Sequence, residues 1–486
     1  MRLLILGGGW LLLIVLGLGI IPVHFDEAQY ATWLAQPDLS YQTKGPWVTL
    51  SQSVTHHLTF LPHIVQVRLP AWGAWLGSGL LLIWLGWLAG FERQHSIKLM
   101  VLFVASPMLL ALGAVHTTDI WLLFFMLLAL CAFASVLHCR PGTQPELWWM
   151  LMGGALGFGA LAKLSIALVP LSILPWVLLR NPRLIFTPGP YLGAMFCALC
   201  LSPWLIWNDA NEWAHLQHEF GHVNSNTDSL WHAVDWIPGL LLASIPAMLL
   251  AVFGAISVRI DQYLNDSQAA VREMLRTSAL TLVVFFVLKG LFGAVLLNWT
   301  LPMLPLLLMA LAVRLKWSVG AVVIAGLAQV GLLLALLFPY GLGLSKEQDA
   351  FQKVRGWEQA VERAAELAGE TAVVSSDHYS TLAWALFFWP SDADDAARYQ
   401  SPLGQVIPQS TRRKNQYDHW GVLNTAHPRV IHLGGDSQAL ATRCGTYRRL
   451  GDVPQLMPDG TVRSTLGVFE CLDFNPTPAW PEIEKH

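Results

Sequence analysis

The sequence predicts a polytopic α-helical membrane protein that ends in a small α/β domain outside the membrane. Of its 486 residues, 54% are hydrophobic and 13% are charged, whereas soluble proteins average roughly 25% charged residues. The charges are also unevenly distributed, with 29 in residues 1–344 and 32 in residues 345–486. This difference predicts a transmembrane domain over 1–344 and a water-facing domain over 345–486. A net charge of −3 without a basic run gives no support to nucleic-acid binding.

Apolar segments long enough to cross a bilayer, at about 20 residues each, recur through the first domain. The first of them resembles a secretion signal but has no small-residue cleavage site before Pro22, so we interpret it as a retained span. The pattern predicts about eleven transmembrane helices, near residues 3–21, 70–90, 98–114, 119–138, 148–164, 165–180, 190–207, 237–258, 277–297, 299–314 and 318–340.

Basic residues near span ends predict the orientation, because they stay on the cytoplasmic side. With a cytoplasmic N-terminus, most of them fall on that side: Arg2, Arg93, Lys98, Arg140, Arg180, Arg183, Arg259, Arg272, Arg276, Arg314 and Lys316. An odd number of spans then exports the C-terminal domain. In a bacterium this predicts an inner-membrane protein with a periplasmic domain.

Two outer loops are long and polar, at residues 22–62 and 208–236. The first places Asp26 and Glu27 within a few residues of the membrane exit, and Asp119 stands at a tight outer turn. Acidic residues therefore collect at the outer surface and not at the bilayer midplane.

The motifs of these loops resemble those of the GT-C fold glycosyltransferases that use lipid-linked sugars, in particular the bacterial protein-mannosyltransferase and aminoarabinose-transferase-like group. The similar segments, in order, are Asp26–Tyr30, Leu39–Tyr41, Lys44–Pro46, Thr118–Asp119, Gly159–Lys163, the run from Pro203 to His222, Asn298–Trp299 and Arg412–Trp420. Relatives often have a histidine and two prolines in place of Lys44–Pro46, whereas aminoarabinose transferases use a lysine there. The resemblance thus implies the class and leaves the sugar open.

The chemistry of such an enzyme requires a base and a cationic site. Outside the cytoplasmic membrane there are no nucleotide sugars, so the donor is expected to be a polyprenyl-phosphate-linked sugar and the acceptor a lipid, glycan or protein. The departing phosphate needs positive charge and hydrogen-bond donors, and the attacking hydroxyl needs a carboxylate to accept its proton. The predicted function is sugar transfer with inversion on the periplasmic face.

Asp26 is the candidate base, with Glu27 and Asp119 as further candidate catalytic residues. The alternative for Asp26 and Glu27 is capping of the short helix that follows, because acids favour helix N-termini. Asp119 has the same alternative at the start of its span, while acids at membrane level are often functional.

Lys44, Arg68 and Lys289 are the candidates for binding the donor phosphate. Lys289 lies 13 residues beyond Arg276, or about 20 Å along a helix, which places it in the outer half of the bilayer. A lysine there can also reach toward headgroups without binding substrate. For Lys163 we favour this second interpretation.

The resemblance implies a further set of substrate-binding residues: Tyr30, Tyr41, Gln217, His222, Asn298, Arg412 and Tyr417. No cofactor is certain. A divalent metal stays possible because His215, His218 and His222 would share one helical face, and His222 alone belongs to the family pattern.

The C-terminal domain is expected to contain a helix over 351–368, a helix over 379–388, and strands over 371–375, 429–433 and 467–472. It holds two cysteines, Cys444 and Cys471. An oxidising compartment would permit a disulfide between them.

Two other functions compete with sugar transfer. A transporter or flippase for a lipid-linked sugar would usually show repeated halves and ionisable groups near the midplane, and the sequence shows neither. A catalytically inactive sensor is the third possibility. The enzymatic hypothesis requires Asp26 to share one outer cavity with the candidate cations.

Overall fold

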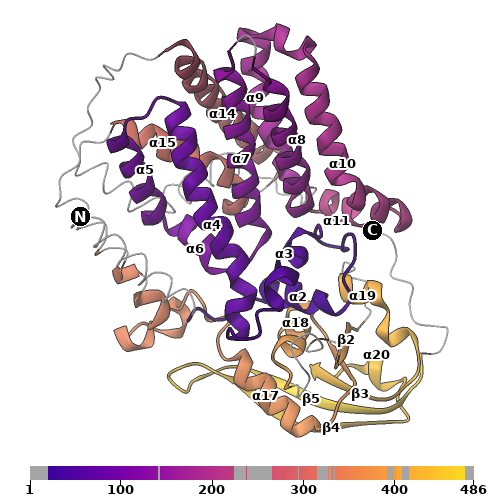
Figure 1. The fold of residues 1–486 in the computed structure, drawn as a ribbon. Coiled ribbons are helices and arrows are strands. Elements are labelled where there is room, and N and C mark those ends of the chain that lie inside the picture. The colour runs from indigo at the N-terminus through magenta and orange to yellow at the C-terminus, as the bar shows by residue number, and fades with distance from the viewer. Residues whose placement is uncertain are drawn as a thin grey trace. The chain divides into compact units, whose positions relative to one another are not determined.

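The computed structural model describes residues 20–140, 143–223, 265–293, 295–314, 330–332, 334–390, 401–407 and 415–476, together with Ile237, Leu327 and Tyr399. These residues belong to two compact units (Figure 1). The first comprises Lys44–Trp47 and the described part of Ala71–Leu332. The second comprises residues 20–43, Val48–Pro70 and the described part of Leu333–His486. The second unit therefore includes most of the first outer loop, which the predicted boundary at 344/345 assigns to the membrane domain.

The first unit is helical. Its elements are the later part of α4 (His63–Leu88), α5 (Arg93–Ala105), α6 (Pro107–Ala114), α7 (Thr118–His138), α8 (Pro145–Ala162), η2 (Leu164–Ala167), α9 (Leu168–Arg180), η3 (Pro182–Phe186), α10 (Pro188–Ala210), α11 (Ala214–Val223), α14 (Asp266–Gly290), η5 (Leu297–Met303) and α15 (Leu304–Arg314).

Within the described residues, three helices are long and apolar enough to cross a membrane: α4, α7 and α10. The pair α5 and α6 passes the same test together but bends by 65°, at the point where Pro107 cannot continue the hydrogen-bond pattern of α5. Most of each of the segments predicted near 3–21, 237–258 and 318–340 lies outside the described residues. A multi-span membrane fold is therefore shown, whereas the number eleven stays a prediction.

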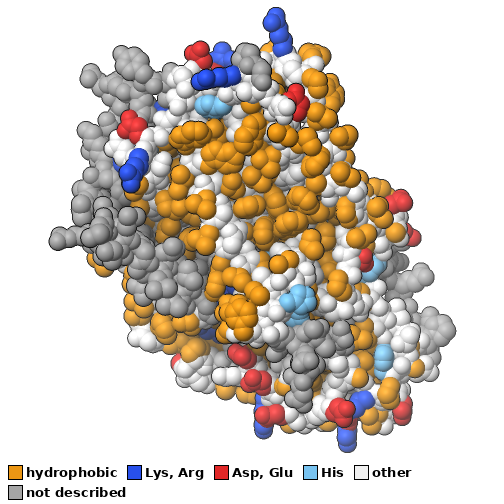
Figure 2. Space-filling model, in the orientation of Figure 1, with side chains coloured by type: hydrophobic (Ala, Val, Ile, Leu, Met, Phe, Trp, Pro, Cys, Tyr) orange, Lys and Arg blue, Asp and Glu red, His pale blue; other side chains and the backbone are white. Residues whose placement is uncertain are grey.

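Apolar side chains cover much of the outer surface of the first unit. In Figure 2 they form a broad area over its helices. Exposed examples include Leu171, Leu174, Leu178, Tyr191 and Met195. Such an extent of exposed apolar surface is typical of a protein in contact with lipid.

Helices α8 and α10 lie side by side (Figure 1) and approach each other through glycines. A Cβ at Gly153 would overlap the carbonyl oxygen of Gly193, and one at Gly157 would come within 2.6 Å of the Cβ of Cys200. Small residues permit this close packing, which is a common basis of helix association in membranes.

A five-stranded sheet is the centre of the second unit. Its strands are β1 (Val373–Ser376), β2 (Leu403–Val406), β3 (His427–Gly434), β4 (Thr446–Leu456) and β5 (Val462–Phe474), in the order β2-β1-β3-β5-β4. Strand β1 is parallel to both β2 and β3, while β5 is antiparallel to β3 and β4. Around the sheet are α17 (Trp357–Ala368), α18 (Tyr379–Phe388), α19 (Gln416–Trp420) and α20 (Gln438–Ala441).

The helix expected over 379–388 has these bounds in the structure. The helix expected over 351–368 begins later, at Trp357, because Gly356 adopts a left-handed conformation with a φ of +77°. Strands β2 and β4 were not expected from the sequence. Both carry polar residues that break an apolar pattern.

The first outer loop contributes two helices, α2 (Phe25–Thr32) and α3 (Trp47–His56), followed by the start of α4. Ala28 and Ala31 of α2 belong to the same core as Val361 of α17 and Leu382 of α18. The indole of Trp384 stacks on that of Trp357, with ring centroids 4.5 Å apart, and donates a hydrogen bond to the Val23 carbonyl at 2.9 Å. The loop is therefore an integral part of the core of the second unit.

The start of α4 contains Pro70, which has no N–H for the carbonyl of Gln66. The Thr55 hydroxyl donates to this carbonyl instead, at 2.7 Å. This hydrogen bond joins α3 to the first turns of α4, from which the Arg68 side chain extends.

Cys444 and Cys471 form a disulfide, with their Cα atoms 5.4 Å apart. The bond joins the segment before β4 to the later part of β5, and the two cysteines are 27 positions apart in the sequence. The sequence left this pairing open, and the structure shows it.

Replacement of both cysteines by serine is expected to destabilise the second unit by about 3 to 4 kcal/mol, because a loop of this length loses its cross-link in the unfolded chain. Thermal unfolding of the purified protein, with and without reductant, measures this. The control Cys197→Ser/Cys200→Ser removes two free thiols, keeps the disulfide and should respond to reductant as wild type does. An equal response of wild type and Cys444→Ser/Cys471→Ser to reductant would contradict the expectation.

Candidate functional site

Asp26 and Glu27 lie in the first turn of α2, whose N-terminus is closed by a capping box. The His24 ring accepts a hydrogen bond from the Asp26 N–H at 3.2 Å, and the Glu27 carboxylate accepts one from the His24 N–H at 3.1 Å. Glu27 thus has the capping role that the sequence allowed. The same geometry fixes the direction in which each acidic side chain extends from the helix.

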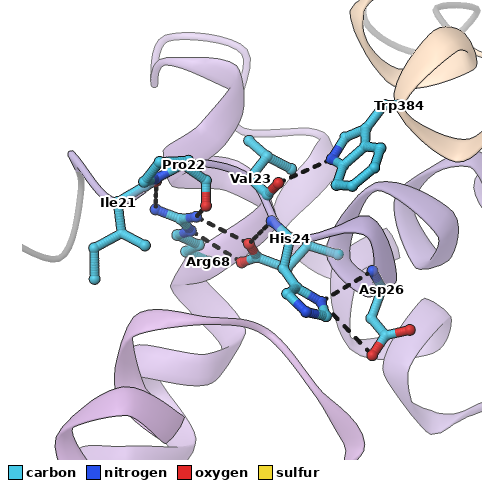
Figure 3. A network of polar contacts seen from close by, with 8 residues as sticks. Ile21, Pro22, Val23, His24, Asp26, Arg68 and Trp384 are labelled. Atoms are coloured by element: carbon cyan, nitrogen blue, oxygen red, sulfur yellow. Dashed lines mark hydrogen bonds and ion pairs between the residues drawn. The ribbon is translucent and has the colours of Figure 1, made fainter. Parts of the chain in front are cut away.

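Glu27 forms a fully buried ion pair with Arg68 (Figure 3). Arg68 Nε donates to one carboxylate oxygen and an Arg68 terminal nitrogen donates to the other, both at 2.9 Å. Further donors of Arg68 reach the carbonyls of Ile21 at 2.8 Å and Pro22 at 3.2 Å. The buried guanidinium is thus surrounded by acceptors of its own unit.

This pair changes two assignments made from the sequence. Arg68 is not an accessible cation, because its side chain is fully buried and directed to Glu27 and two carbonyls. Glu27 is not an accessible base, because both of its oxygens are engaged by the guanidinium. We therefore assign both residues to the structure of the loop and leave them out of the proposed chemistry.

Asp26 differs from its neighbour. Its side chain is 31% exposed, and its carboxylate lies 3.7 Å from the His24 ring. In Figure 3 it points away from Arg68, on the other side of His24. Of the two adjacent acids, Asp26 is therefore the accessible one.

Tyr379 at the start of α18 is a neighbour of Asp26 that the sequence did not indicate. Burial, with a smaller contribution from the negative charge of Asp26, raises the pKa of Tyr379 to about 12. The Tyr379 ring also packs edge-on against Phe25, with centroids 5.8 Å apart. The surroundings of Asp26 thus come partly from the C-terminal part of the chain.

Asp119 is at the centre of a second polar cluster, in the first unit. Lys163 Nζ lies 2.6 Å from one carboxylate oxygen, and Asn298 Nδ2 donates to the other at 3.3 Å. Asp119 also occupies the first turn of α7, where the helix dipole stabilises its charge. The cluster joins the start of α7, the end of α8 and η5.

The structure thus brings together three residues that the sequence resemblance named separately. Lys163 pairs with Asp119 and does not extend toward headgroups as we expected. Asp119 is only 9% exposed. We assign it a positioning role, because its carboxylate is occupied by Lys163 and Asn298.

Lys44 belongs to a third cluster, also in the first unit. Its Nζ lies 3.8 Å from the Glu219 carboxylate, which is 3.9 Å from the His215 ring. The Trp204 indole donates to the other nitrogen of His215 at 2.8 Å. Glu219 was missed by the sequence reasoning, although its position four residues after His215 on α11 would place both on one helical face.

Burial, with smaller contributions from the positive charges of Lys44 and His218, lowers the pKa of His215 to about 3. The ring is therefore neutral at physiological pH. Among the described residues, no group of three His, Cys, Asp or Glu side chains is arranged to hold a metal. His222 lies in α11, but its side chain is outside the described residues.

Three tyrosines expected to bind substrate are buried. The rings of Tyr30 and Tyr41 both pack against the Trp33 indole, with ring centroids 5.2 and 4.3 Å from it. The Tyr417 hydroxyl is hydrogen-bonded to the Thr32 hydroxyl at 2.9 Å, and burial raises the pKa of Tyr417 above its usual range. These side chains hold the first loop and α19 in place, and their part in substrate binding stays a prediction.

The remaining candidates have different environments. Lys289 Nζ lies 5.6 Å from the centroid of the Trp299 ring, in a cation–π contact. Gln217 is exposed and donates to the Glu212 carbonyl at 2.7 Å. Arg412 lies outside the described residues.

A multi-span helical unit with polar clusters at its loops, together with a second unit that includes most of the first loop, is an arrangement in which this chain is similar to the GT-C class of membrane fold. Two crystal structures of ArnT from Cupriavidus metallidurans show this likeness over nearly the whole chain. The apo structure aligns with a TM-score of 0.62 at 15% identity, covering 95% of this chain and 98% of ArnT. The structure bound to undecaprenyl phosphate aligns with a TM-score of 0.63 at 16% identity, covering 96% and 98%.

Sequence comparisons agree. The family model for dolichyl-phosphate-mannose-protein mannosyltransferase matches residues 45–207. Undecaprenyl phosphate-alpha-4-amino-4-deoxy-L-arabinose arabinosyl transferase from Erwinia tasmaniensis is 26% identical over 35% of this chain, and the match spans 32% of that relative. Lipid A galacturonosyltransferase RgtD from Rhizobium johnstonii is 23% identical over 82% of this chain and 86% of its own length.

These findings confirm the resemblance inferred from the sequence. The chain is similar to the GT-C lipid-linked-sugar glycosyltransferases of the aminoarabinose-transferase-like type. The match to the Erwinia tasmaniensis relative spans about a third of that relative's length.

Arg68→Met is expected to destabilise the protein by about 3 to 5 kcal/mol, because it leaves the Glu27 carboxylate buried without a partner. Thermal unfolding of the purified protein measures this, and adding Glu27→Gln should recover part of the loss. The control Arg363→Met breaks an exposed ion pair with Glu366 and should cost at most about 1 kcal/mol. Equal losses in Arg68→Met and the control would contradict the structural role.

His215 should also make stability depend on pH. The folded protein keeps this ring neutral down to about pH 3, whereas the unfolded chain protonates it below its ordinary value of 6.5. The contribution of the neutral His215 ring to folding stability is therefore fully present above pH 6.5 and is lost as the pH falls from 6.5 to about 3. Between neutral pH and about pH 5, the free energy of unfolding of His215→Asn should consequently fall by about 2 kcal/mol less than that of wild type. Unfolding midpoints across this range test the expectation, with exposed His419→Asn as the control; parallel curves for all three proteins would contradict it.

Proposed function

We propose that this protein is a glycosyltransferase that moves a sugar from a polyprenyl-phosphate donor to a lipid acceptor on the periplasmic face of the inner membrane. The proposal includes eleven spans, a cytoplasmic N-terminus and an exported C-terminal α/β domain. The names of the relatives support it, since both describe transfer of a sugar and one describes lipid A as its acceptor. The ArnT structure bound to undecaprenyl phosphate supports a donor of that class.

Asp26 is the proposed base. The observation that carries this assignment is the different use of the two adjacent acids: Glu27 is buried against Arg68, whereas Asp26 is accessible beside the His24 ring. A base must reach the proton of a substrate hydroxyl. Asp26 meets this condition and Glu27 does not.

In the proposed reaction, the acceptor hydroxyl oxygen attacks the anomeric carbon while its proton passes to the Asp26 carboxylate. The bond between that carbon and the phosphate oxygen breaks, and its electron pair leaves with the phosphate. Attack from the face opposite to the leaving group inverts the configuration. No group other than the donor, the acceptor and Asp26 is needed for this balance.

Lys44 and Lys289 are the proposed cations for the donor phosphate. Lys44 is about one-third exposed, and its nearest acid, Glu219, is 3.8 Å away, so a phosphate can approach the ammonium. Lys289 lies near the end of α14 over an indole ring. Positive charge at the departing phosphate stabilises the transition state. Asn298 is proposed to act through Asp119, by fixing η5 against α7.

Transport of a lipid-linked sugar is the second candidate function named by the sequence. The relatives favour transfer over transport, because the named activities are those of transferases. An assay that counts both labelled product and label moved across a membrane separates the two functions.

Asp26→Asn is expected to lower transfer by about 100-fold or more, because a general base typically contributes that much. Purified protein is incubated with a radiolabelled polyprenyl-phosphate sugar and lipid acceptors, and labelled product is counted. Asp38→Asn, an exposed acid in the same loop, is the matched control and should retain activity.

The unfolding midpoint and binding of the donor lipid show whether Asp26→Asn is folded. Transfer by a folded Asp26→Asn protein within a few-fold of wild type would reject the base assignment. Movement of label across vesicle membranes without product formation would instead favour the flippase.

A further inference from the structure

The sheet of the second unit reverses its strand order at one place. From β1 the chain proceeds to β2 on one side, and it then returns as β3 on the other side of β1. In open α/β sheets, ligands bind in the crevice at the carboxyl ends of the strands where such a reversal occurs. Here Asp377 follows β1, Gly434 ends β3, and Gly435 and Asp436 follow β3.

A cavity of about 520 Å³ lies at this end of the sheet. Its lining includes Gly434, Asp436, Tyr447, Arg448, Arg449 and Phe469. Small-molecule sites typically have volumes of roughly 300 to 1,000 Å³. The cavity is thus large enough for a sugar unit, and none of its residues belongs to the clusters described above.

The turn beside the cavity is held by a buried histidine. His432 Nε2 lies 2.9 Å from the Gly435 carbonyl, which can only accept, so this nitrogen donates, and Nδ1 is hydrogen-bonded to the Ser375 hydroxyl at 3.1 Å. The Asp377 carboxylate accepts from the Gly435 N–H at 2.6 Å. A Cβ at Gly434, whose φ is +151°, would overlap that carboxylate. These contacts give the turn a fixed shape.

Asp377 is charged in this arrangement. Burial alone would raise its pKa, but hydrogen bonds and charge from His432 and the Gly435 N–H lower the pKa below its ordinary value. Asp436 contributes a second carboxylate, which helps to raise the pKa of Tyr447 to about 12, after the larger effect of burial. The turn therefore offers hydrogen-bond acceptors.

The opposite wall carries rings and donors. Tyr447 and Phe469 are stacked with centroids 5.5 Å apart and nearly parallel planes, and the Arg449 guanidinium lies 5.6 Å from the Phe469 centroid. Arg448 is bound to Glu470 at 2.7 Å, and Arg449 is paired with Asp452. Because both arginines already have carboxylate partners, the cavity is close to neutral and suits a hydroxyl-rich ligand better than a phosphate.

We infer that this cavity binds a saccharide unit of the acceptor. Hydroxyls of the sugar donate to the Asp436 carboxylate and accept from arginine N–H groups, while its C–H face packs on the half-buried Tyr447 ring, which the buried Phe469 supports. The identity of the ligand as acceptor rests on the proposed function, whereas the binding of a saccharide does not.

The chain itself connects this cavity with the proposed base. Asp377 is followed in the chain by His378 and Tyr379. The Tyr379 ring contacts Phe25, and the negative charge of Asp26 helps to raise the pKa of Tyr379. A glycan seated at the end of β1 and β3 would therefore be bound next to the segment that flanks Asp26. The second unit then selects the acceptor as well as carrying the base.

Binding is tested with the full-length protein in detergent by saturation-transfer NMR, using cellobiose, maltose and N,N′-diacetylchitobiose as probes. Arg449→Ala should weaken binding of the best probe about tenfold, which corresponds to loss of one charged hydrogen bond. The matched control is Arg363→Ala, because both arginines belong to exposed ion pairs with an acid three residues on. Unfolding midpoints of the two variants verify equal folding.

Saccharide signals that Arg449→Ala weakens and Arg363→Ala leaves unchanged support the site. Absence of signal from every probe on wild type, equal weakening by both variants, or displacement of the probe by inorganic phosphate would overturn it. Asp26→Asn distinguishes the two proposals: it should abolish transfer while saccharide binding persists. If wild type binds saccharide but transfers no sugar, the proposed function fails and the saccharide site stands.

Discussion

The buried ion pair between Glu27 and Arg68 is the interaction on which the first outer loop depends. Removing two charges from water is costly, and in this protein the cost is offset by two hydrogen bonds at 2.9 Å and by two backbone carbonyls. The pair joins the start of α2 to the start of α4 across 41 residues. It therefore fixes α2 at the point where Asp26 leaves the helix.

The same constraint separates two residues that the sequence presents as equivalent. Adjacent residues in the first turn of a helix point in directions about 100° apart, because a turn contains 3.6 residues. Glu27 is directed into the core and meets Arg68, while Asp26 stays accessible beside His24. A protein can in this way use one acid for structure and leave its neighbour for chemistry.

Several parts of this protein could be predicted before any coordinates were known. The apolar spans near α4, α7 and α10 and the bounds of α18 follow from hydropathy and local periodicity. The association of Asp119, Lys163 and Asn298 was not predicted, although each residue was named, because α7, α8 and η5 are distant in sequence. The burial of Tyr30, Tyr41 and Tyr417 was not predicted for a related reason: a motif does not reveal whether its tyrosines pack inside the protein or lie at its surface.

The sequence by itself determined the membrane character of the chain, the place of its polar loops and the class of protein it resembles. These properties depend on the type and order of residues along the chain, since the bilayer responds to local hydrophobicity. The tertiary structure decided which charged groups are accessible, which are paired, and that the first loop shares a core with the C-terminal sheet. Those outcomes depend on contacts between residues far apart in sequence, such as Glu27 with Arg68 and Thr32 with Tyr417, and no local pattern encodes them.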